Sequence, residues 1–163
     1  DFFISKPIFQ SVVQDVLLKA TRRRQSAATL PVQKEDFAGR RILLVEDNEI
    51  NMEIARTLLE FRNASVDGAC NGQQAVEMFR SSPPNHYDAV LMDVRMPVMD
   101  GIAATQSIRG LNRADAATVP ILAMTANAFA EDIEQSRKAG MNEHLAKPIE
   151  PETLYARLAS YFR

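Results

Sequence analysis

Residues 87–97 read Tyr-Asp-Ala-Val-Leu-Met-Asp-Val-Arg-Met-Pro. An apolar run in this stretch ends in one carboxylate, Asp93, and a Met-Pro turn follows after two further residues. A carboxylate at the carboxyl end of a buried strand is costly to place, and this end of an open α/β sheet is where ligands bind. Asp93 could accept a phosphoryl group, bind a metal, attack a substrate or cap a helix.

Strand and helix patterns alternate around this stretch. Short apolar or alternating runs predict strands, and apolar residues at three- or four-residue spacing predict helices. Such alternation is typical of βα units in a parallel sheet covered on both faces, so we expect an α/β doubly wound fold. The second strand alternates apolar and polar residues and is expected at a sheet edge. The predicted strands are 42–45, 64–70, 87–92, 120–124 and 143–146, and the predicted helices are 48–61, 72–79, 101–108, 129–139 and 150–162.

The first part of the chain has a different composition. Residues 21–39 are polar and charged, which predicts a linker, and residues 8–20 have the spacing of an amphipathic helix. The chain opens with Asp1 rather than Met, so we interpret it as a piece of a longer protein.

A short sequence motif near the start of the chain is repeated near its end. The segment 3–8 (Phe-Ile-Ser-Lys-Pro-Ile) echoes 144–149 (His-Leu-Ala-Lys-Pro-Ile), and an amphipathic helix follows each. The match is either a coincidence or a sign that 1–20 is the last strand and helix of a preceding, similar domain. The expected organisation is this remnant over 1–20, a linker over 21–39 and one complete domain over 40–163.

Composition argues against several classes of protein. A net charge of −2 provides no electrostatic case for nucleic acid binding. Cys70 is the single cysteine and there are two histidines, which argues against a disulfide framework and a zinc site. No apolar run approaches the roughly 20 residues of a membrane-spanning helix, so we expect no direct membrane contact.

Polar side chains follow four of the predicted strands. Glu46 and Asp47 follow the first strand, Asp93 ends the third, Thr125 follows the fourth and Lys147 follows the fifth. The carboxyl ends of parallel strands share one edge, so these side chains can meet in one crevice. Three nearby carboxylates raise each other's pKa, and Mg²⁺ with its oxygen ligands resolves that repulsion. Lys147 supplies a compact positive charge that suits a phosphate oxygen or Asp93 itself. Together with the Thr125 hydroxyl it would neutralise the charge that develops as a phosphoryl group moves to a carboxylate.

Each of these residues also has a simpler interpretation. Asp47 could cap the helix that starts at Asn48, and Asp100 is expected to cap the helix that follows it. Thr125 or Lys147 alone would indicate nothing about function. The signal lies in their joint placement.

Residues 41–163 resemble a response-regulator receiver domain of two-component signalling. The variant is similar to the C-terminal receivers of hybrid sensor histidine kinases, and residues 1–20 then resemble the tail of another receiver. The resemblance implies a flavodoxin-like five-stranded sheet of order 2-1-3-4-5 with five helices, plus an extra N-terminal helix. The matching stretches are Leu44-Val45-Glu46-Asp47-Asn48, the run from Leu91 to Gly101, Ala123-Met124-Thr125-Ala126 and Leu145-Ala146-Lys147-Pro148.

The resemblance also implies a role for each site residue. Asp93 would take a phosphoryl group from a phosphohistidine, and Thr125 and Lys147 would contact that group. The domain would then relay the phosphoryl group or switch conformation. The Mg²⁺ ligands would be Asp47, Asp93 and the backbone carbonyl of Arg95, with Glu46 acting through water.

The implied partners are a histidine kinase core, a histidine phosphotransfer domain, or both. This fragment would catalyse only its own phosphorylation and dephosphorylation, while the parent would be a hybrid histidine kinase. We expect a cytoplasmic location, whether or not the parent is anchored in a membrane.

One departure from the family concerns the switch, which pairs Thr125 with an aromatic residue three positions before Lys147. The family usually has Tyr or Phe at that position, and this chain has His144. His144 is either a partly exposed edge residue or part of a weaker or differently read switch.

Two other functions can be compared with this one. A phosphatase of the haloacid-dehalogenase kind needs a second acid two residues after the nucleophile, where this chain has Arg95. A pseudo-receiver would be an interaction module without phosphotransfer, and Mg²⁺ titration would separate it from a working receiver.

Overall fold

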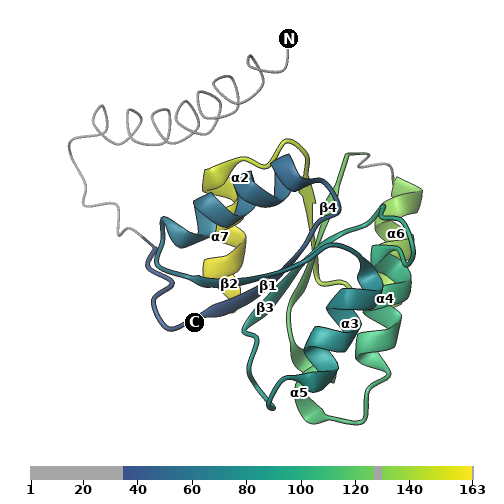
Figure 1. Cartoon of the computed structure of the whole chain (residues 1–163). Helices are drawn as coiled ribbons and strands as arrows, with labels where there is room; N and C mark the ends of the chain where they lie inside the picture. The colour runs from purple at the N-terminus through teal and green to yellow at the C-terminus, as the bar shows by residue number, and fades with distance from the viewer. Residues whose placement is uncertain (1–34, 127–129, 163) are drawn as a thin grey trace, which may run out of the picture.

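The computed structural model of the chain describes residues 35–126 and 130–162 (Figure 1). The predicted helix over 8–20 and the Lys6-Pro7 repeat lie outside these residues. Every strand and helix predicted within 40–163 is present, with ends within two residues of the predicted ones. In chain order the elements are β1 (Arg41–Val45), α2 (Glu49–Glu60), β2 (Ser65–Ala69), α3 (Gly72–Ser81), β3 (Ala89–Asp93), α4 (Gly101–Arg109), α5 (Ala114–Thr118), β4 (Ile121–Thr125), α6 (Ala130–Ala139), β5 (Glu143–Ala146) and α7 (Pro151–Tyr161).

The strands form one parallel sheet in the order β2-β1-β3-β4-β5. Every residue of β3 and β4 is buried, which explains why both strands read as continuous apolar runs. The half-polar β2 lies at an edge, as predicted. The doubly wound fold and the strand order are thereby confirmed.

Helices cover both faces of the sheet, with α2 and α7 on one face and α3, α4 and α6 on the other (Figure 1). Successive side chains of β1 supply the two cores in turn. Leu43 and Val45 pack in the core beneath α3 and α4, while Ile42 and Leu44 pack in the core beneath α2 and α7. This division follows from the two-residue period of a strand. None of the helices in the described ranges is both long and apolar enough to cross a membrane.

Side-chain caps begin helices α2, α3 and α4, and two of these caps test the predictions for Asp47 and Asp100. The Asn48 side chain accepts hydrogen bonds from the N–H groups of Ile50 and Asn51, so Asn48, and not Asp47, caps α2. Asp100 accepts a hydrogen bond from the Ala103 N–H at the start of α4, which confirms its predicted role. The Asp47 side chain is therefore not needed as the cap of α2 and can serve the site.

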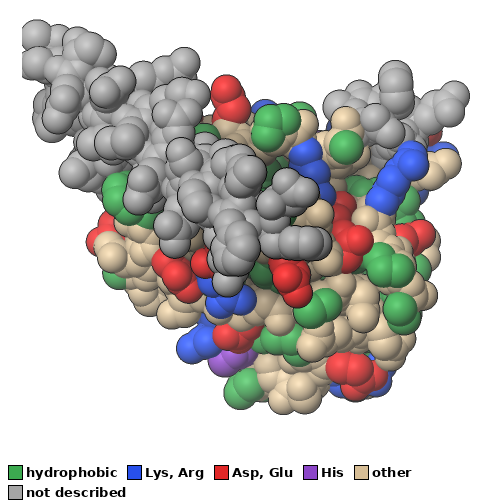
Figure 2. Space-filling model, turned by 45° about the horizontal axis from the view of Figure 1, so that its top comes forward, with side chains coloured by type: hydrophobic (Ala, Val, Ile, Leu, Met, Phe, Trp, Pro, Cys, Tyr) green, Lys and Arg blue, Asp and Glu red, His purple; other side chains and the backbone are tan. Residues whose placement is uncertain are grey.

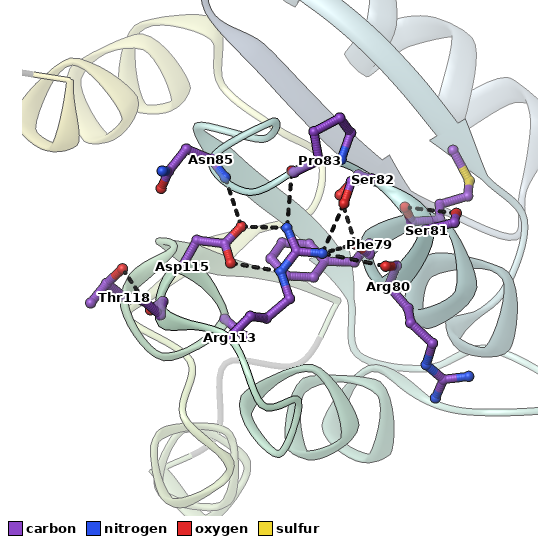
Figure 3. Close-up of polar contacts among 12 residues, drawn as sticks. Phe79, Arg80, Ser81, Ser82, Pro83, Asn85, Arg113, Asp115 and Thr118 are labelled. Carbon is purple, nitrogen blue, oxygen red and sulfur yellow. Dashed lines mark hydrogen bonds and ion pairs between the residues drawn. The ribbon is translucent and has the colours of Figure 1, made fainter.

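Helix α5 and the cluster beside it were not predicted. Arg113, just before α5, makes a two-bond ion pair with Asp115, with both N–O distances at 2.7 Å (Figure 3). The same guanidinium donates to the carbonyls of Phe79, Ser82 and Pro83 at 2.8–3.0 Å. Arg113 thus connects the loops that lead into β3 and β4. These loops lie at the amino ends of the strands, whereas Asp93 lies at the carboxyl end of β3.

The last residues of the predicted linker lie against the domain. Phe37 is 2% exposed, and its ring centroid is 6.1 Å from that of Tyr155 and 5.3 Å from that of Phe162. Its N–H donates to the Arg62 carbonyl at 2.7 Å. The folded unit in the described residues therefore begins before Arg40.

Candidate functional site

A cleft of about 240 Å³ opens at the edge where the strands end. It brings together all the residues that the sequence singled out for chemistry except His144. Its lining also includes residues that the sequence did not assign to the site: Asn48, Asn51, Val94 and Ala126. The complete lining is Glu46, Asp47, Asn48, Asn51, Asp93, Val94, Arg95, Thr125, Ala126 and Lys147.

Strand pairing determines this convergence. The pairing of β3 with β4 extends to Asp93, and the pairing of β4 with β5 extends to Thr125. Glu46 and Lys147 come directly after β1 and β5, and the Lys147 N–H extends the pairing by donating to the Thr125 carbonyl at 2.9 Å. The carboxyl ends of four neighbouring strands therefore bring polar side chains to one place.

Two buried carboxylates share one lysine in the cleft. Lys147 Nζ lies 2.8 Å from Glu46 Oε2 and 3.1 Å from Asp93 Oδ2. Asp93 is 4% exposed and Glu46 is 3% exposed. The Arg95 N–H donates to Asp93 Oδ1 at 3.3 Å. The pairing of Lys147 with Glu46 was not predicted, because the sequence indicated only Asp93 or a phosphate oxygen as its partner.

The charges in the cleft shift the pKa values of both partners. Burial, and then the negative charge of Glu46, raise the pKa of Asp93 to about 7, against the opposing effect of Lys147. Burial also acts to lower the pKa of Lys147, but its hydrogen bond to Glu46 and the charges of Asp93 and Glu46 outweigh that effect and raise it. The lysine is thus held in its charged form beside a carboxylate that retains its proton more readily than usual.

Three carboxylates in the cleft can direct oxygens at one point. One oxygen each from Glu46, Asp47 and Asp93 lie within 4.8 Å of one another. Asp47 is exposed, whereas the other two are buried. An all-oxygen, multiply negative set of donors suits a hard divalent cation such as Mg²⁺. The residues present therefore fit the predicted ion.

Glycines allow the chain to turn back tightly beside Asp93. A Cβ atom on Gly101 would collide with the backbone carbonyl of Asp93, and one on Gly72 would collide with the carbonyl of Met99. Gly101 N–H donates to the Val94 carbonyl at 2.9 Å, which closes the loop between β3 and α4. The absence of a side chain at Gly101 thus lets the first turn of α4 lie against the backbone of Asp93.

His144 lies outside the cleft lining. It sits on the edge strand β5, opposite Ala123 in register, and is partly buried. Its Nε2 is buried and has no hydrogen-bond partner among the described residues. Burial, with a further effect from Arg137, lowers its pKa, which favours the neutral imidazole.

Figure 2 looks toward the end of the molecule at which the strands finish. Acidic, basic and hydrophobic side chains lie close to one another on this face. The described part of this face therefore carries side chains of mixed character rather than of a single charge.

Comparison with known proteins identifies the family. Residues 42–159 match the family model described as the response regulator receiver domain. Hybrid signal transduction histidine kinase I of Dictyostelium discoideum is 30% identical over 155 residues, which cover 94% of this chain and 9% of that protein. The histidine-protein kinase BarA of Escherichia coli K12 is 35% identical over 156 residues, 96% of this chain and 16% of BarA. The chain therefore spans less than a fifth of the length of either relative.

Solved structures show the same fold. The receiver domain of the sensor histidine kinase PA1611 from Pseudomonas aeruginosa, described with a magnesium ion coordinated in its active site cleft, is 41% identical with a TM-score of 0.69, covering 76% of this chain and 98% of that one. A chain in the co-crystal structure of the Saccharomyces cerevisiae histidine phosphotransfer protein Ypd1 with the receiver domain of Ssk1 is 31% identical, with a TM-score of 0.68, covering 77% of this chain and 90% of that one.

The sheet order, the carboxylates and lysine at its carboxyl edge, and the family match over residues 42–159 agree with one another. This chain belongs to the response regulator receiver domain family of two-component signalling.

Proposed function

We propose that this receiver is a phosphoacceptor and that Asp93 takes the phosphoryl group from a phosphohistidine. The observation that supports this most directly is the position of Asp93, which is 4% exposed at the base of the cleft and lies 3.1 Å from Lys147. Burying a carboxylate beside two further acids is costly, and groups with such perturbed surroundings cluster at functional sites.

The proposed reaction is an in-line transfer. A carboxylate oxygen of Asp93 attacks phosphorus as the bond between phosphorus and the histidine nitrogen breaks, and that nitrogen keeps the bonding pair and later takes a proton from solvent. Lys147 stabilises charge on the phosphoryl oxygens, and the Thr125 hydroxyl donates to one of them. Hydrolysis, or transfer to another histidine, reverses the acyl phosphate to the free carboxylate.

The proposed Mg²⁺ ligands are Asp47, Asp93 and the Arg95 backbone carbonyl, with Glu46 acting through water. When bound, the ion would supply positive charge to the phosphoryl oxygens. The carboxylate oxygens within 4.8 Å of one another support this assignment.

Phosphorylation is proposed to act through Thr125 and the surface beyond it. The hydroxyl moves toward the phosphoryl group, and the face formed by α6, β5 and α7 changes shape, with His144 in the place of the usual switch aromatic. Phosphorylation would thus add negative charge at Asp93 and shift this face between two conformations.

We infer that the parent protein is a hybrid histidine kinase with a histidine phosphotransfer domain as a further partner. The similarity to two such kinases covers 94% and 96% of the chain, so it continues upstream of the matched domain into residues 1–34. This supports the proposal that the parent is such a kinase and that residues 1–20 belong to a part of it that precedes the receiver. The co-crystal of a similar receiver with Ypd1 supports the phosphotransfer partner.

The test is incubation of the purified chain with acetyl phosphate and Mg²⁺, read by intact mass. We expect one added phosphoryl group on the wild type and none on Asp93→Asn. Asp88→Asn serves as the matched control, because Asp88 lies at the other end of the sheet beside Arg40 and should leave labelling unchanged. Absence of both labelling and carboxylate-dependent Mg²⁺ binding would identify a pseudo-receiver instead.

A further inference from the structure

Val98 has an unfavourable backbone conformation. Its φ is +69°, in the left-handed region, where a β-branched side chain is a clear outlier. The other non-glycine residues with positive φ in the described ranges are Asn63 and Asn85, and asparagine tolerates this region well. Val98 is therefore the residue type least suited to its position.

The fold gains little from the Val98 side chain. Val98 is 82% exposed, the highest value among the three large hydrophobic residues exposed in the described ranges. Its neighbours Met96 and Met99 pack against the core beneath α3 and α4. Polar or glycine residues would satisfy the backbone better at no loss of packing, so the isopropyl group needs another explanation.

Backbone hydrogen bonds on either side of Val98 fix its position in the loop. Met99 N–H donates to the Pro97 carbonyl at 2.8 Å, and Gly72 N–H donates to the Met99 carbonyl at 3.0 Å. The first bond closes a tight turn around Val98, and the second attaches the residue after Val98 to the start of α3. An apolar group that is already fixed loses little freedom when a partner covers it, which favours binding.

Val98 belongs to the loop that leaves the reaction cleft. The loop begins with Val94 and Arg95, which line the cleft. Ile50, also exposed at 54%, lies in the first turn of α2, between the lining residues Asn48 and Asn51. The third exposed apolar residue, Phe61, lies at the far end of α2. A protein that brings a phosphohistidine to the buried Asp93 must cover the carboxyl end of the sheet, where the loop that carries Val98 follows β3.

We propose that Val98 is an apolar anchor for the protein surface that surrounds the partner's phosphohistidine, retained at a cost to the stability of the free domain. The occupant is a histidine-bearing protein with apolar side chains beside its reactive histidine. This inference rests on the proposed phosphoacceptor function. A small phosphodonor such as acetyl phosphate reaches Asp93 without covering the loop that carries Val98. Its reaction therefore does not depend on the anchor.

The experiment compares a protein donor with a small one. Phosphorylated Ypd1 is the protein probe and acetyl phosphate with Mg²⁺ is the small one. We expect Val98→Asn to lower the second-order rate of transfer from Ypd1 by about tenfold, the effect of removing one good apolar anchor. Its rate with acetyl phosphate and its Mg²⁺ affinity should stay within about twofold of the wild type. Val98→Leu, which keeps an apolar side chain, should retain transfer from Ypd1.

Two controls separate the anchor from general effects. Phe61→Asn removes an exposed apolar residue far from the cleft and should leave both rates unchanged. Val98→Asn should also raise the melting temperature by about 3–5 °C, because the left-handed backbone is no longer strained.

The outcomes are distinct. Loss of labelling with acetyl phosphate in the wild type would remove the proposed function itself. Normal labelling combined with no transfer from Ypd1 to the wild type, or with equal transfer to Val98→Asn, would overturn the anchor. The anchor would also fail if light scattering showed that Val98→Asn only dissociates a dimer of this chain.

Discussion

At the scale of single residues, the main feature of the cleft is that it holds more buried negative than positive charge. Glu46, Asp93 and Lys147 are held together so closely that one lysine serves two buried carboxylates. Such an arrangement is costly for the folded domain, and its cost should be visible in stability and in metal binding.

The first prediction concerns the stability of the folded domain. The pKa of Asp93 is raised to about 7 in the native state, whereas an unfolded aspartate titrates near 4. Between these values the native state holds a proton that the unfolded state releases, so stability falls as the pH rises through this range. Asp93→Asn removes the carboxylate and should increase the free energy of unfolding at pH 8 by roughly 1–3 kcal/mol.

Urea unfolding followed by circular dichroism at pH 4 and at pH 8 measures this effect. The gain should vanish near pH 4, where both forms are neutral at residue 93. Asp88→Asn, which removes the partner of Arg40, should destabilise the domain instead. A gain for Asp93→Asn that is the same at both pH values would contradict the explanation.

The second prediction concerns proton release on metal binding. In the proposed site Mg²⁺ would bind the ionised carboxylate of Asp93, so at pH 6 its binding would displace the proton that Asp93 holds there. Calorimetric titration in buffers of different ionisation enthalpy should show release of close to one proton at pH 6 and almost none at pH 8.5. The affinity for Mg²⁺ should fall correspondingly as the pH drops below about 7. Equal proton release at both values would show that another group governs binding.

At the scale of elements, Arg113 connects parts that local sequence does not relate. Its guanidinium binds Asp115 on α5 and four carbonyls at the end of α3 and the following loop, and it lies 4.9 Å from the centre of the Phe79 ring. Figure 3 shows the fork of Arg113 between these groups. Planar geometry and five donors make arginine specific for such a position.

The third prediction tests this connection. Arg113→Lys keeps the charge but loses the fork, so we expect the free energy of unfolding to fall by about 1–3 kcal/mol. Labelling by acetyl phosphate at a temperature well below unfolding should be unchanged, because the cluster lies at the other edge of the sheet. Arg80→Lys is the control, since its ion pair with Glu77 is more than half exposed on both sides and should change stability by less than about 0.5 kcal/mol.

At the scale of the whole molecule, the two ends of the described domain close on each other. Phe37 and Phe162 both lie outside the family match at 42–159, and their rings are in contact. Arg40 reinforces this closure by donating to the Phe162 carbonyl at 2.8 Å. The segment that enters the domain is thereby attached to the end of α7.

The fourth prediction measures this closure. Phe37→Ala should lower the free energy of unfolding by about 3 kcal/mol, the usual cost of emptying a buried aromatic site. Phe61→Ala, on a side chain that is 48% exposed, should have little effect. Equal and small effects of both substitutions would show that residues 35–40 only rest on the surface.

The sequence by itself determined the order of the elements and the position of the cleft. Apolar runs, helical spacing and turn residues are local signals, and parallel pairing then brings Glu46, Asp93, Thr125 and Lys147 to one edge whatever the details of packing. The family resemblance rested on the same residues. Helix α5 escaped prediction because five residues are too few to show a period, and its cap residue makes no side-chain cap bond.

Only the tertiary structure decided which partners the polar side chains take. Lys147 pairs with Glu46 across 101 residues of sequence, and Arg40 reaches the Phe162 carbonyl across 122. It also revealed the positive φ of Val98 and the burial of Phe37. Such features depend on contacts between distant segments and on the path of the backbone, and no local pattern of residue types encodes them.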